Sequence, residues 1–189
     1  KFAVSVLNHM REKLIGYQME YGNLYGLEAT PAESATFRFA RLDRERFSGI
    51  RTAGHEGDTP YYTNSTKLPA DYDGTLQGAL INQDSLQPLY TTGTVFHVYM
   101  ERELEDWKKA RDLLSSMITE HHIPCFTLSP VYTICQTCGY LPGRQERCPK
   151  CNGAADVYSR IAGYYRPVHD WNDGKAQEFR NRIMFRIGE

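Results

Sequence analysis

The sequence predicts a mixed α/β fold, because segments with helical periodicity alternate with β-branched and aromatic runs along most of its length. Two long helical segments flank a strand-like run at residues 94–99, and a compact cysteine-rich segment follows them. At 189 residues the chain is long enough for one sizeable core with a small appended module.

The amino-terminal third predicts two helices. Apolar residues recur at alternating steps of three and four from Leu7 to Leu24, and Gly26 is a typical stop signal. A second helix is predicted to begin at Thr30, as its N-cap, with Pro31 at the first helical position and Glu33 at the capping-box spacing. Such a start is a potential anion site, because free backbone N–H groups and the helix dipole both favour negative charge.

The middle of the chain predicts a loop-rich segment, a helix, a strand, a helix and a further strand, over residues 42–73, 74–90, 94–99, 101–123 and 126–134. In the helix at 101–123 the residues expected to face inward are Leu104, Trp107, Leu114, Met117 and Ile118, and the acidic residues expected in its first turns are Glu101, Glu103, Glu105 and Asp106. The isolated Cys125 is expected to be a small buried residue, and His97, His121 and His122 to be structural.

Four cysteines form two C-x-x-C pairs separated by nine residues: Cys135, Cys138, Cys148 and Cys151. Two thiolates on one tight turn can grip a metal ion, and a second such turn completes the tetrahedral sulfur shell of structural zinc. Gly139 and Gly153 follow the two pairs and are expected to relieve the backbone there. An iron–sulfur cluster is the alternative metal site. Disulfides are disfavoured because no secretory signal is found and C-x-x-C pairs rarely bridge in a reducing compartment, and a thioredoxin-like motif would need one pair in a βα turn.

The segment after the cysteines predicts a turn and a last helix. On local sequence alone, Gly163 is a turn glycine between two strands, and Pro167 keeps the next residues extended. Asn172 or Asp173 is expected to cap the helix. The residues on its apolar face are Ala176, Phe179, Ile183 and Ile187, and those on its solvated face are Lys175, Arg180, Arg182 and Arg186.

Composition excludes several classes of protein. The 22 basic and 23 acidic residues nearly cancel, so no nucleic-acid-binding field is expected. Neither a membrane-spanning run nor a signal-peptide pattern is found, so we expect a cytoplasmic protein without a membrane partner. Because the chain opens directly in a helical repeat without an initiator methionine, we expect it to begin within a longer protein.

Residues 157–182 read VYSRIAGYYRPVHDWNDGKAQEFRNR and directly follow the cysteine segment. They resemble the carboxy-terminal signature of the anaerobic (class III) ribonucleotide reductases, glycyl-radical enzymes with the pattern R-[IV]-x-G-Y after a four-cysteine zinc site. Residues 14–25, 27–33, 60–65 and 90–97 match the same family in the same order, so the resemblance covers nearly the whole chain. Ala162 departs from it, since relatives usually carry Thr, Cys or Ser there.

The resemblance implies a fold and a radical site. The fold would be part of a ten-stranded α/β barrel: the later barrel elements over residues 1–130, a zinc-binding module over 131–156, and a glycyl-radical domain with its terminal helix over 157–189. Gly163 would carry the stored radical, installed by a radical-SAM activating enzyme, and Cys135, Cys138, Cys148 and Cys151 would bind Zn²⁺. An α-carbon radical without a Cβ can flatten and delocalise over both neighbouring peptide groups.

The resemblance also implies a substrate and partners. Ribonucleoside triphosphates would be reduced to deoxyribonucleoside triphosphates, with formate or a dithiol protein as reductant. Their phosphates would lie over the residues Glu28, Thr30, Pro31, Ala32, Glu33 and Ser34. The family's thiyl cysteine has no counterpart here, because Cys125 stands in a different context. We therefore expect the chain to need an upstream part of the reductase, which is expected to be an allosteric homodimer.

Two alternatives remain open. A spare glycyl-radical subunit that docks onto a damaged enzyme would resemble the family only in its tail, whereas this resemblance begins near Leu14. A zinc-ribbon module for protein or nucleic-acid binding would carry a basic face, but Arg144, Arg147 and Lys150 are few.

Overall fold

A computed structural model of the protein describes residues 1–187. Its helices are α1 (Phe2–Tyr21), α2 (Glu33–Arg46), α3 (Leu76–Asp84), α4 (Trp107–Glu120) and α5 (Asp173–Asn181), with short 3-10 turns η1 (Gln87–Leu89) and η2 (Val168–Asp170). Its strands are β1 (Phe96–Met100), β2 (Phe126–Pro130), β3 (Tyr132–Cys135), β4 (Gly139–Pro142), β5 (Ala155–Arg160) and β6 (Tyr165–Pro167).

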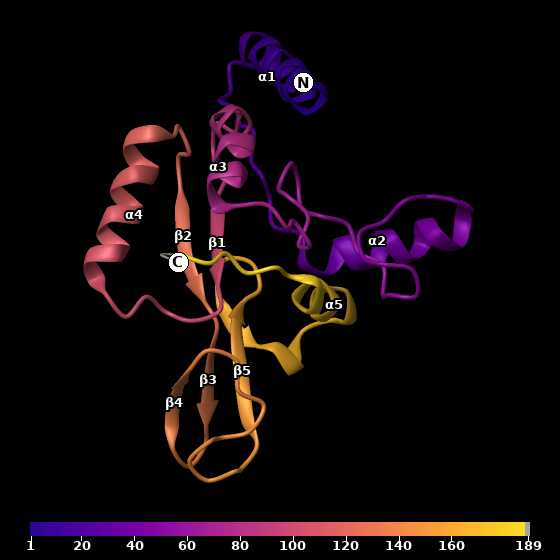
Figure 1. The fold of residues 1–189 in the computed structure, drawn as a ribbon. Coiled ribbons are helices and arrows are strands. Elements are labelled where there is room, and N and C mark those ends of the chain that lie inside the picture. The colour runs from indigo at the N-terminus through magenta and orange to yellow at the C-terminus, as the bar shows by residue number, and fades with distance from the viewer. Residues whose placement is uncertain (188–189) are drawn as a thin grey trace.

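The strands form two sheets that share one continuous stretch of chain. Strands β1 and β2 pair in parallel, and α4 connects them as a βαβ unit. Strand β2 runs through Val131 into β3, which lies in an antiparallel sheet of order β4-β3-β5-β6. Figure 1 shows α1 and the four-stranded sheet at opposite ends of the molecule, with α4 beside β2 and α5 beside β5. The α/β class is confirmed, while the ten-stranded barrel and the three-segment division stay predictions.

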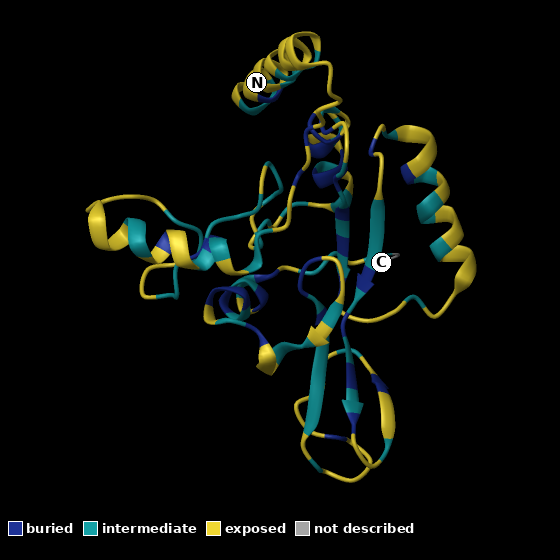
Figure 2. Ribbon diagram, turned by 180° about the vertical axis from the view of Figure 1, so that it is seen from behind, coloured by how far each residue is buried: buried dark blue, intermediate teal, exposed yellow. Residues whose placement is uncertain are grey.

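Helix α1 ends earlier than expected. Gly22 adopts a left-handed φ of 70° and donates its N–H to the carbonyl of Gln18, which caps the helix at Tyr21. The predicted stop at Gly26 is therefore wrong. Most of the predicted apolar stripe is uncovered: Leu7 is buried, but Leu24 is 95% exposed, and Figure 2 shows α1 as largely exposed.

Helix α2 begins later than expected. Its N-cap is Ala32 and its first residue is Glu33, so Thr30 as cap and Pro31 as first helical residue are wrong. A long-range contact holds the chain just before the helix: the Ala32 N–H donates to Asn64 Oδ1 at 3.2 Å, and no side-chain hydrogen bond caps the first turn. The helix continues to Arg46, and the predicted loop starts there rather than at residue 42.

The main core surrounds β1. Val98, Met117 and Leu80 are at most 2% exposed and join β1, α4 and α3. In α4 the inward face was predicted only in part, because Trp107 and Ile118 are each 67% exposed. The expected acidic first turn is also wrong. The helix starts after Asp106, which caps it by accepting the Lys108 N–H at 2.8 Å, and Glu101, Glu103 and Glu105 precede it.

Helix α5 carries charged residues into the interior. Asn172 caps it, as predicted, by accepting the Lys175 N–H at 3.0 Å. Lys175 is 2% exposed and Arg182 is 8% exposed, so their assignment to a solvated face is wrong. Both pair with the same carboxylate, since Glu178 lies 2.6 Å from Lys175 Nζ and 3.2 Å from Arg182 Nη2.

The tail after α5 explains this burial. The helix ends at Asn181, so the predicted helical residues Ile183 and Ile187 lie outside it. The chain then runs extended along the core, where the Phe185 N–H donates to the carbonyl of Tyr99 at 2.8 Å. The Arg182 guanidinium lies 3.7 Å from the centre of the Tyr99 ring, so the aromatic face and Glu178 together compensate its lost hydration.

Replacing Glu178 with Ala should destabilise the protein strongly, because it leaves two buried cations without their carboxylate. We expect a loss of about 3–5 kcal/mol in the free energy of unfolding, measured by urea denaturation. The control is Glu45→Ala, which breaks the exposed pair with Arg41 at 3.9 Å and should cost about 0.5 kcal/mol or less. Equal losses in the two variants would contradict the buried network.

Candidate metal centre and active site

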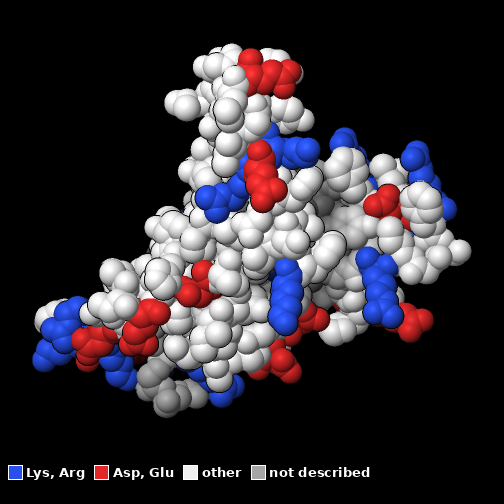
Figure 3. All heavy atoms as spheres, turned by 90° about the horizontal axis from the view of Figure 1, so that it is seen from above, with Lys and Arg blue, Asp and Glu red and all other residues white. Residues whose placement is uncertain are grey.

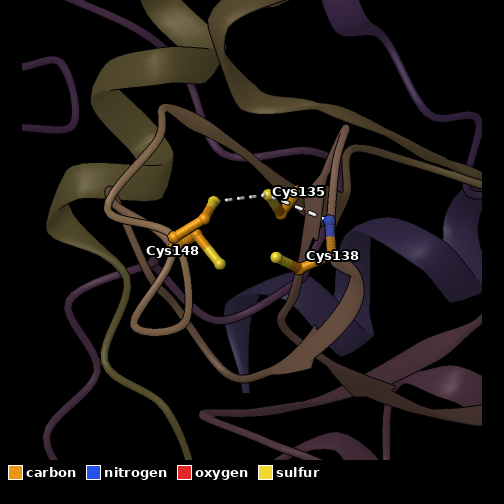
Figure 4. Close-up of side chains that lie close together, drawn as sticks. Cys135, Cys138 and Cys148 are labelled. Carbon is orange, nitrogen blue, oxygen red and sulfur yellow. Dashed lines mark hydrogen bonds between the residues drawn. The ribbon is translucent and has the colours of Figure 1, made fainter.

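The four paired cysteines converge on one point. Their four sulfur atoms all lie within 4.8 Å of one another. Among residues 1–187, these cysteines form the group of clustered His, Cys, Asp or Glu side chains that could hold a metal ion. Cys135 ends β3, Cys138 lies in the turn to β4, and Cys148 and Cys151 come from the loop before β5. Figure 4 shows the side chains of Cys135, Cys138 and Cys148 turned toward a common centre.

Backbone hydrogen bonds shape both cysteine turns. In the first, the Cys138 N–H donates to Cys135 Sγ at 3.4 Å, and Gly139 takes a left-handed φ of 78°. In the second, the Asn152 N–H donates to the Cys148 carbonyl at 2.8 Å. Here Asn152, with φ 58°, takes the left-handed position expected of Gly153. Asparagine tolerates this conformation better than most residues, which explains the difference.

The sulfur atoms fit a zinc ion in spacing and chemistry. A tetrahedral Zn²⁺ with Zn–S bonds of about 2.3 Å sets its ligands roughly 3.8 Å apart, and Cys135 Sγ lies 3.6 Å from Cys151 Sγ. Backbone N–H groups of Cys151 and then Lys150 lower the pKa of Cys148 to about 6, which favours its thiolate. A hydrogen bond with Cys151 raises the pKa of Cys138 to about 12.

Gly163 lies in a tight turn between β5 and β6. The Ile161 N–H donates to the Tyr164 carbonyl at 3.1 Å and closes the turn, while Arg160 Nη1 donates to the Gly163 carbonyl at 2.7 Å. The glycine is exposed, and its φ lies outside the left-handed region. A Cβ built at this position meets nothing within 4 Å. Neither backbone strain nor lack of space therefore requires a glycine here.

A cavity of about 100 Å³ lies behind this turn. Ile161 and Ala162 line it from the turn, Pro31 from the start of α2, and Asn64 and His97 from two further predicted motif segments. Four stretches that the sequence singled out separately therefore meet at one cavity.

The predicted phosphate-binding residues are only partly gathered there. Besides Pro31, Glu33 reaches the glycine turn: Tyr164 Oη donates to Glu33 Oε2 at 3.3 Å, and Asn172 Nδ2 donates to the Glu33 carbonyl at 3.2 Å. Ala32 is half-buried at the helix cap, whereas Thr30 and Ser34 are exposed. Glu28 is exposed and forms a backbone bridge with Gly93, away from the cavity lining.

Sequence reasoning missed the cations of the cavity. Lys67, Lys175 and Arg182 all line it, together with Glu178. Burial, then the charge of Lys67 and of the nearby arginines, lowers the pKa of His97 to about 3, so this imidazole is neutral and hydrogen-bonded to Thr127. The spacing of Lys175, Glu178 and Arg182 at steps of three and four was the available signal for an ion network.

The expectations for Cys125, for surface charge and for membrane helices can be compared with the structure. Cys125 is exposed, so its expected burial is wrong; its carbonyl nevertheless accepts the Phe96 N–H at the start of β1. On the face shown in Figure 3, basic and acidic side chains lie interspersed. No helix among residues 1–187 is both long and apolar enough to cross a membrane.

Comparisons with known proteins agree on one family. A family model described as anaerobic ribonucleoside-triphosphate reductase matches residues 1–185. The proteins of that name from Haemophilus influenzae and from Enterobacteria phage T4 are 24% identical over 191 residues and 25% identical over 194 residues. The matches cover 95% and 94% of this chain but only 26% and 30% of those proteins. The chain therefore spans less than a third of the length of these relatives.

Solved structures show the same fold. An anaerobic ribonucleotide reductase matches with a TM-score of 0.75 and 22% identity, over 95% of this chain and 28% of that one. The anaerobic ribonucleotide reductase of Thermotoga maritima, solved with MES in its active site, matches with a TM-score of 0.71 and 22% identity, over 88% of this chain and 26% of that one.

Replacing Cys148 with Ser should abolish tight metal binding, because three thiolates leave the tetrahedral shell incomplete. We expect one zinc per chain in the purified protein, and a loss of at least tenfold in zinc affinity in the variant. Elemental analysis and a chelator competition measure both. Cys125→Ser is the matched control and should keep its zinc, since Cys125 lies outside the cluster. An equal loss in the two variants would contradict the four-cysteine site.

Proposed function

The chain belongs to the anaerobic ribonucleoside-triphosphate reductase family, and we propose that it supplies the radical glycine, the zinc site and part of the substrate pocket for this reaction. The reaction converts ribonucleoside triphosphates to deoxyribonucleoside triphosphates in the cytoplasm. A further part of the reductase, within a homodimer, would supply the thiyl cysteine.

The conformation of Gly163 carries the proposal. A turn that leaves room for a Cβ, at an ordinary φ, gives no structural reason for glycine. A stored α-carbon radical does give one, because a Cβ hinders the planar geometry through which the unpaired electron spreads over the adjacent peptide groups. Gly163 directly follows Ile161 and Ala162, which line the cavity that we propose for substrate, and this supports its assignment.

Installing the radical on Gly163 consumes one external electron and one molecule of S-adenosylmethionine. A radical-SAM activating enzyme reduces S-adenosylmethionine by one electron, releasing methionine and a 5′-deoxyadenosyl radical. That radical takes one hydrogen atom from the α-carbon of Gly163 and leaves as 5′-deoxyadenosine. Once installed, the glycyl radical supplies an oxidant that can generate the thiyl radical needed to take the ribose 3′-hydrogen. Formate or a dithiol supplies the two electrons consumed when the 2′-hydroxyl leaves as water.

The zinc site has a mechanical role in this proposal. Cys135 and Ala155 are partners in the β3–β5 ladder, and β5 leads directly to the glycine turn. A metal that grips the loops at one end of β3 and β5 thereby fixes the strand that positions Gly163. Metal binding contributes folding free energy, which a small sheet with few buried apolar residues needs.

The start of α2 is our proposed phosphate site. The first N–H groups of a helix lack intrahelical partners, and Pro31, at this end, lines the cavity that also holds Lys67 and Lys175. Both features favour a polyanion. The residues assigned to phosphate are Glu28, Thr30, Pro31, Ala32, Glu33 and Ser34, of which Pro31 lines this cavity and Glu28 forms a backbone bridge with Gly93.

Replacing Gly163 with Ala should abolish the radical without disturbing the fold. Low-temperature EPR under anoxia, with the activating enzyme, S-adenosylmethionine and a one-electron donor, should show a glycine-type doublet in the native protein and none in the variant. Because the added methyl group meets nothing within 4 Å, unfolding free energy should change by about 0.5 kcal/mol or less.

Gly16→Ala is the matched control, since a Cβ at this helical glycine also meets nothing within 4 Å. It should keep the doublet. A doublet that survives in Gly163→Ala would move the radical elsewhere and refute its assignment. Absence of any doublet in the native, zinc-loaded protein, even with the upstream part of a reductase added, would refute the proposed activity.

Adding a negative charge at the start of α2 should weaken nucleotide binding. We expect Ser34→Glu to bind CTP at least about tenfold more weakly, because the new carboxylate opposes the phosphates at the helix terminus. Binding of cytidine, which lacks phosphates, should change little. Ser48→Glu is the control, since Ser48 is an exposed serine just beyond the other end of α2. Isothermal titration calorimetry measures the binding of CTP and of cytidine to each of the two variants. Equal weakening of CTP binding in both variants would count against the site.

A further inference from the structure

The side chain of Arg160 is held at three places around the glycine turn. Its Nη1 donates to the Gly163 carbonyl at 2.7 Å, and its Nε donates to Ser129 Oγ at 3.0 Å. The guanidinium carbon lies 4.8 Å from the centre of the Tyr165 ring. A planar fork fixed by two hydrogen bonds and one aromatic face has little freedom to rotate.

The anchor of Arg160 lies deep in the protein. Ser129 is fully buried, and its Oγ lies 2.9 Å from Thr127 Oγ1. Thr127 in turn contacts His97 Nδ1 at 2.8 Å, and His97 lines the cavity. A continuous hydrogen-bonded chain therefore runs from a cavity-lining imidazole through β2 to the carbonyl of Gly163.

We propose that Arg160 is a positioning residue that fixes the Gly163 carbonyl and draws electron density toward it. This inference rests on the proposed radical role of Gly163. In this role Arg160 controls how readily the α-carbon radical of Gly163 forms and how long that radical lasts.

A glycyl radical spreads over an electron-donating amide nitrogen and an electron-accepting carbonyl. A cationic donor at 2.7 Å makes the carbonyl a better acceptor and holds its plane in one orientation. Because Ser129 and Tyr165 hold Arg160 before the reaction, the group does not have to reorganise when spin density develops.

The contact itself can be tested without any radical. Labelling with [1-¹³C]glycine and [¹⁵N]tyrosine selects Gly–Tyr peptide bonds, of which the chain has three, at Gly16, Gly139 and Gly163. The Gly163 carbonyl resonance is the one missing in Gly163→Ala. We expect Arg160→Met to move this resonance upfield, as loss of a hydrogen bond does, and to leave the other two unchanged. An unmoved resonance would overturn the inference.

The functional consequence needs the activated protein. We expect Arg160→Met to lower the yield of the glycyl doublet about tenfold, the factor expected for one charge-assisted hydrogen bond, and to change the ¹³C hyperfine coupling of the Gly163 carbonyl. Arg160→Lys should restore part of the yield, because it keeps a cationic donor. Ser129→Ala should give an intermediate loss, because it removes the anchor but leaves the guanidinium in place.

Arg166→Met is the matched control. Arg166 is an exposed arginine on β6, paired with Ser159 in the same sheet, and only its backbone carbonyl is bonded to Trp171, whose indole Nε1–H it accepts. The EPR doublet of the Arg166→Met variant should match that of the native protein. Suppose that the native protein gives the doublet, and that Arg160→Met, with zinc and stability intact, gives the same yield and hyperfine coupling. The positioning role is then refuted, while the radical function stands. If the native protein gives no doublet, both fall.

Discussion

Strand β5 is the element on which the candidate site depends. On one side it pairs with β3, in the register that sets Cys135 opposite Ala155, and on the other it pairs with β6, which begins directly after the glycine turn. The cysteine loops and the Gly163 turn therefore lie at the two ends of one short strand. In our proposal, a metal bound by the cysteines orders one end of this strand and thereby limits the freedom of the turn at the other end.

A buried ion network holds the other wall of the cavity. Glu178 pairs with Lys175 and Arg182, and Arg182 also donates to Ser159 Oγ and to the carbonyl of Arg160 on β5. The same network therefore fixes α5, the last strand residues before the turn, and the cavity. It leaves the cavity cationic overall, since Lys67 adds a further charge and His97 is neutral. This charge agrees with our proposal of a phosphate-bearing ligand, because a neutral ligand would leave the charge uncompensated.

Local patterns in the sequence predicted the cysteine cluster and one helix cap well, and predicted long-range contacts poorly. The convergence of four cysteines followed from their spacing, because each pair must turn tightly and two turns complete one shell. The Asn172 cap followed in the same way. The start of α2 did not, since Asn64 from a distant loop binds the N–H of Ala32 and the helix begins after that residue. Nor did the burial of Lys175, because periodicity shows which residues share a face but not which face the rest of the chain covers.

The extent of the family match favours a catalytic role over a tail subunit or a zinc ribbon. Neither alternative needs residues before the cysteine segment, yet the match covers residues 1–185 and includes the cavity residues Pro31, Asn64 and His97. Gly163 is exposed at the rim of this cavity, and a stored radical must be shielded from water and oxygen. The relatives are more than three times as long as the matched region. In our proposal the reductase part that supplies the thiyl cysteine also covers this rim, so that shielding and hydrogen transfer arise from the same contact.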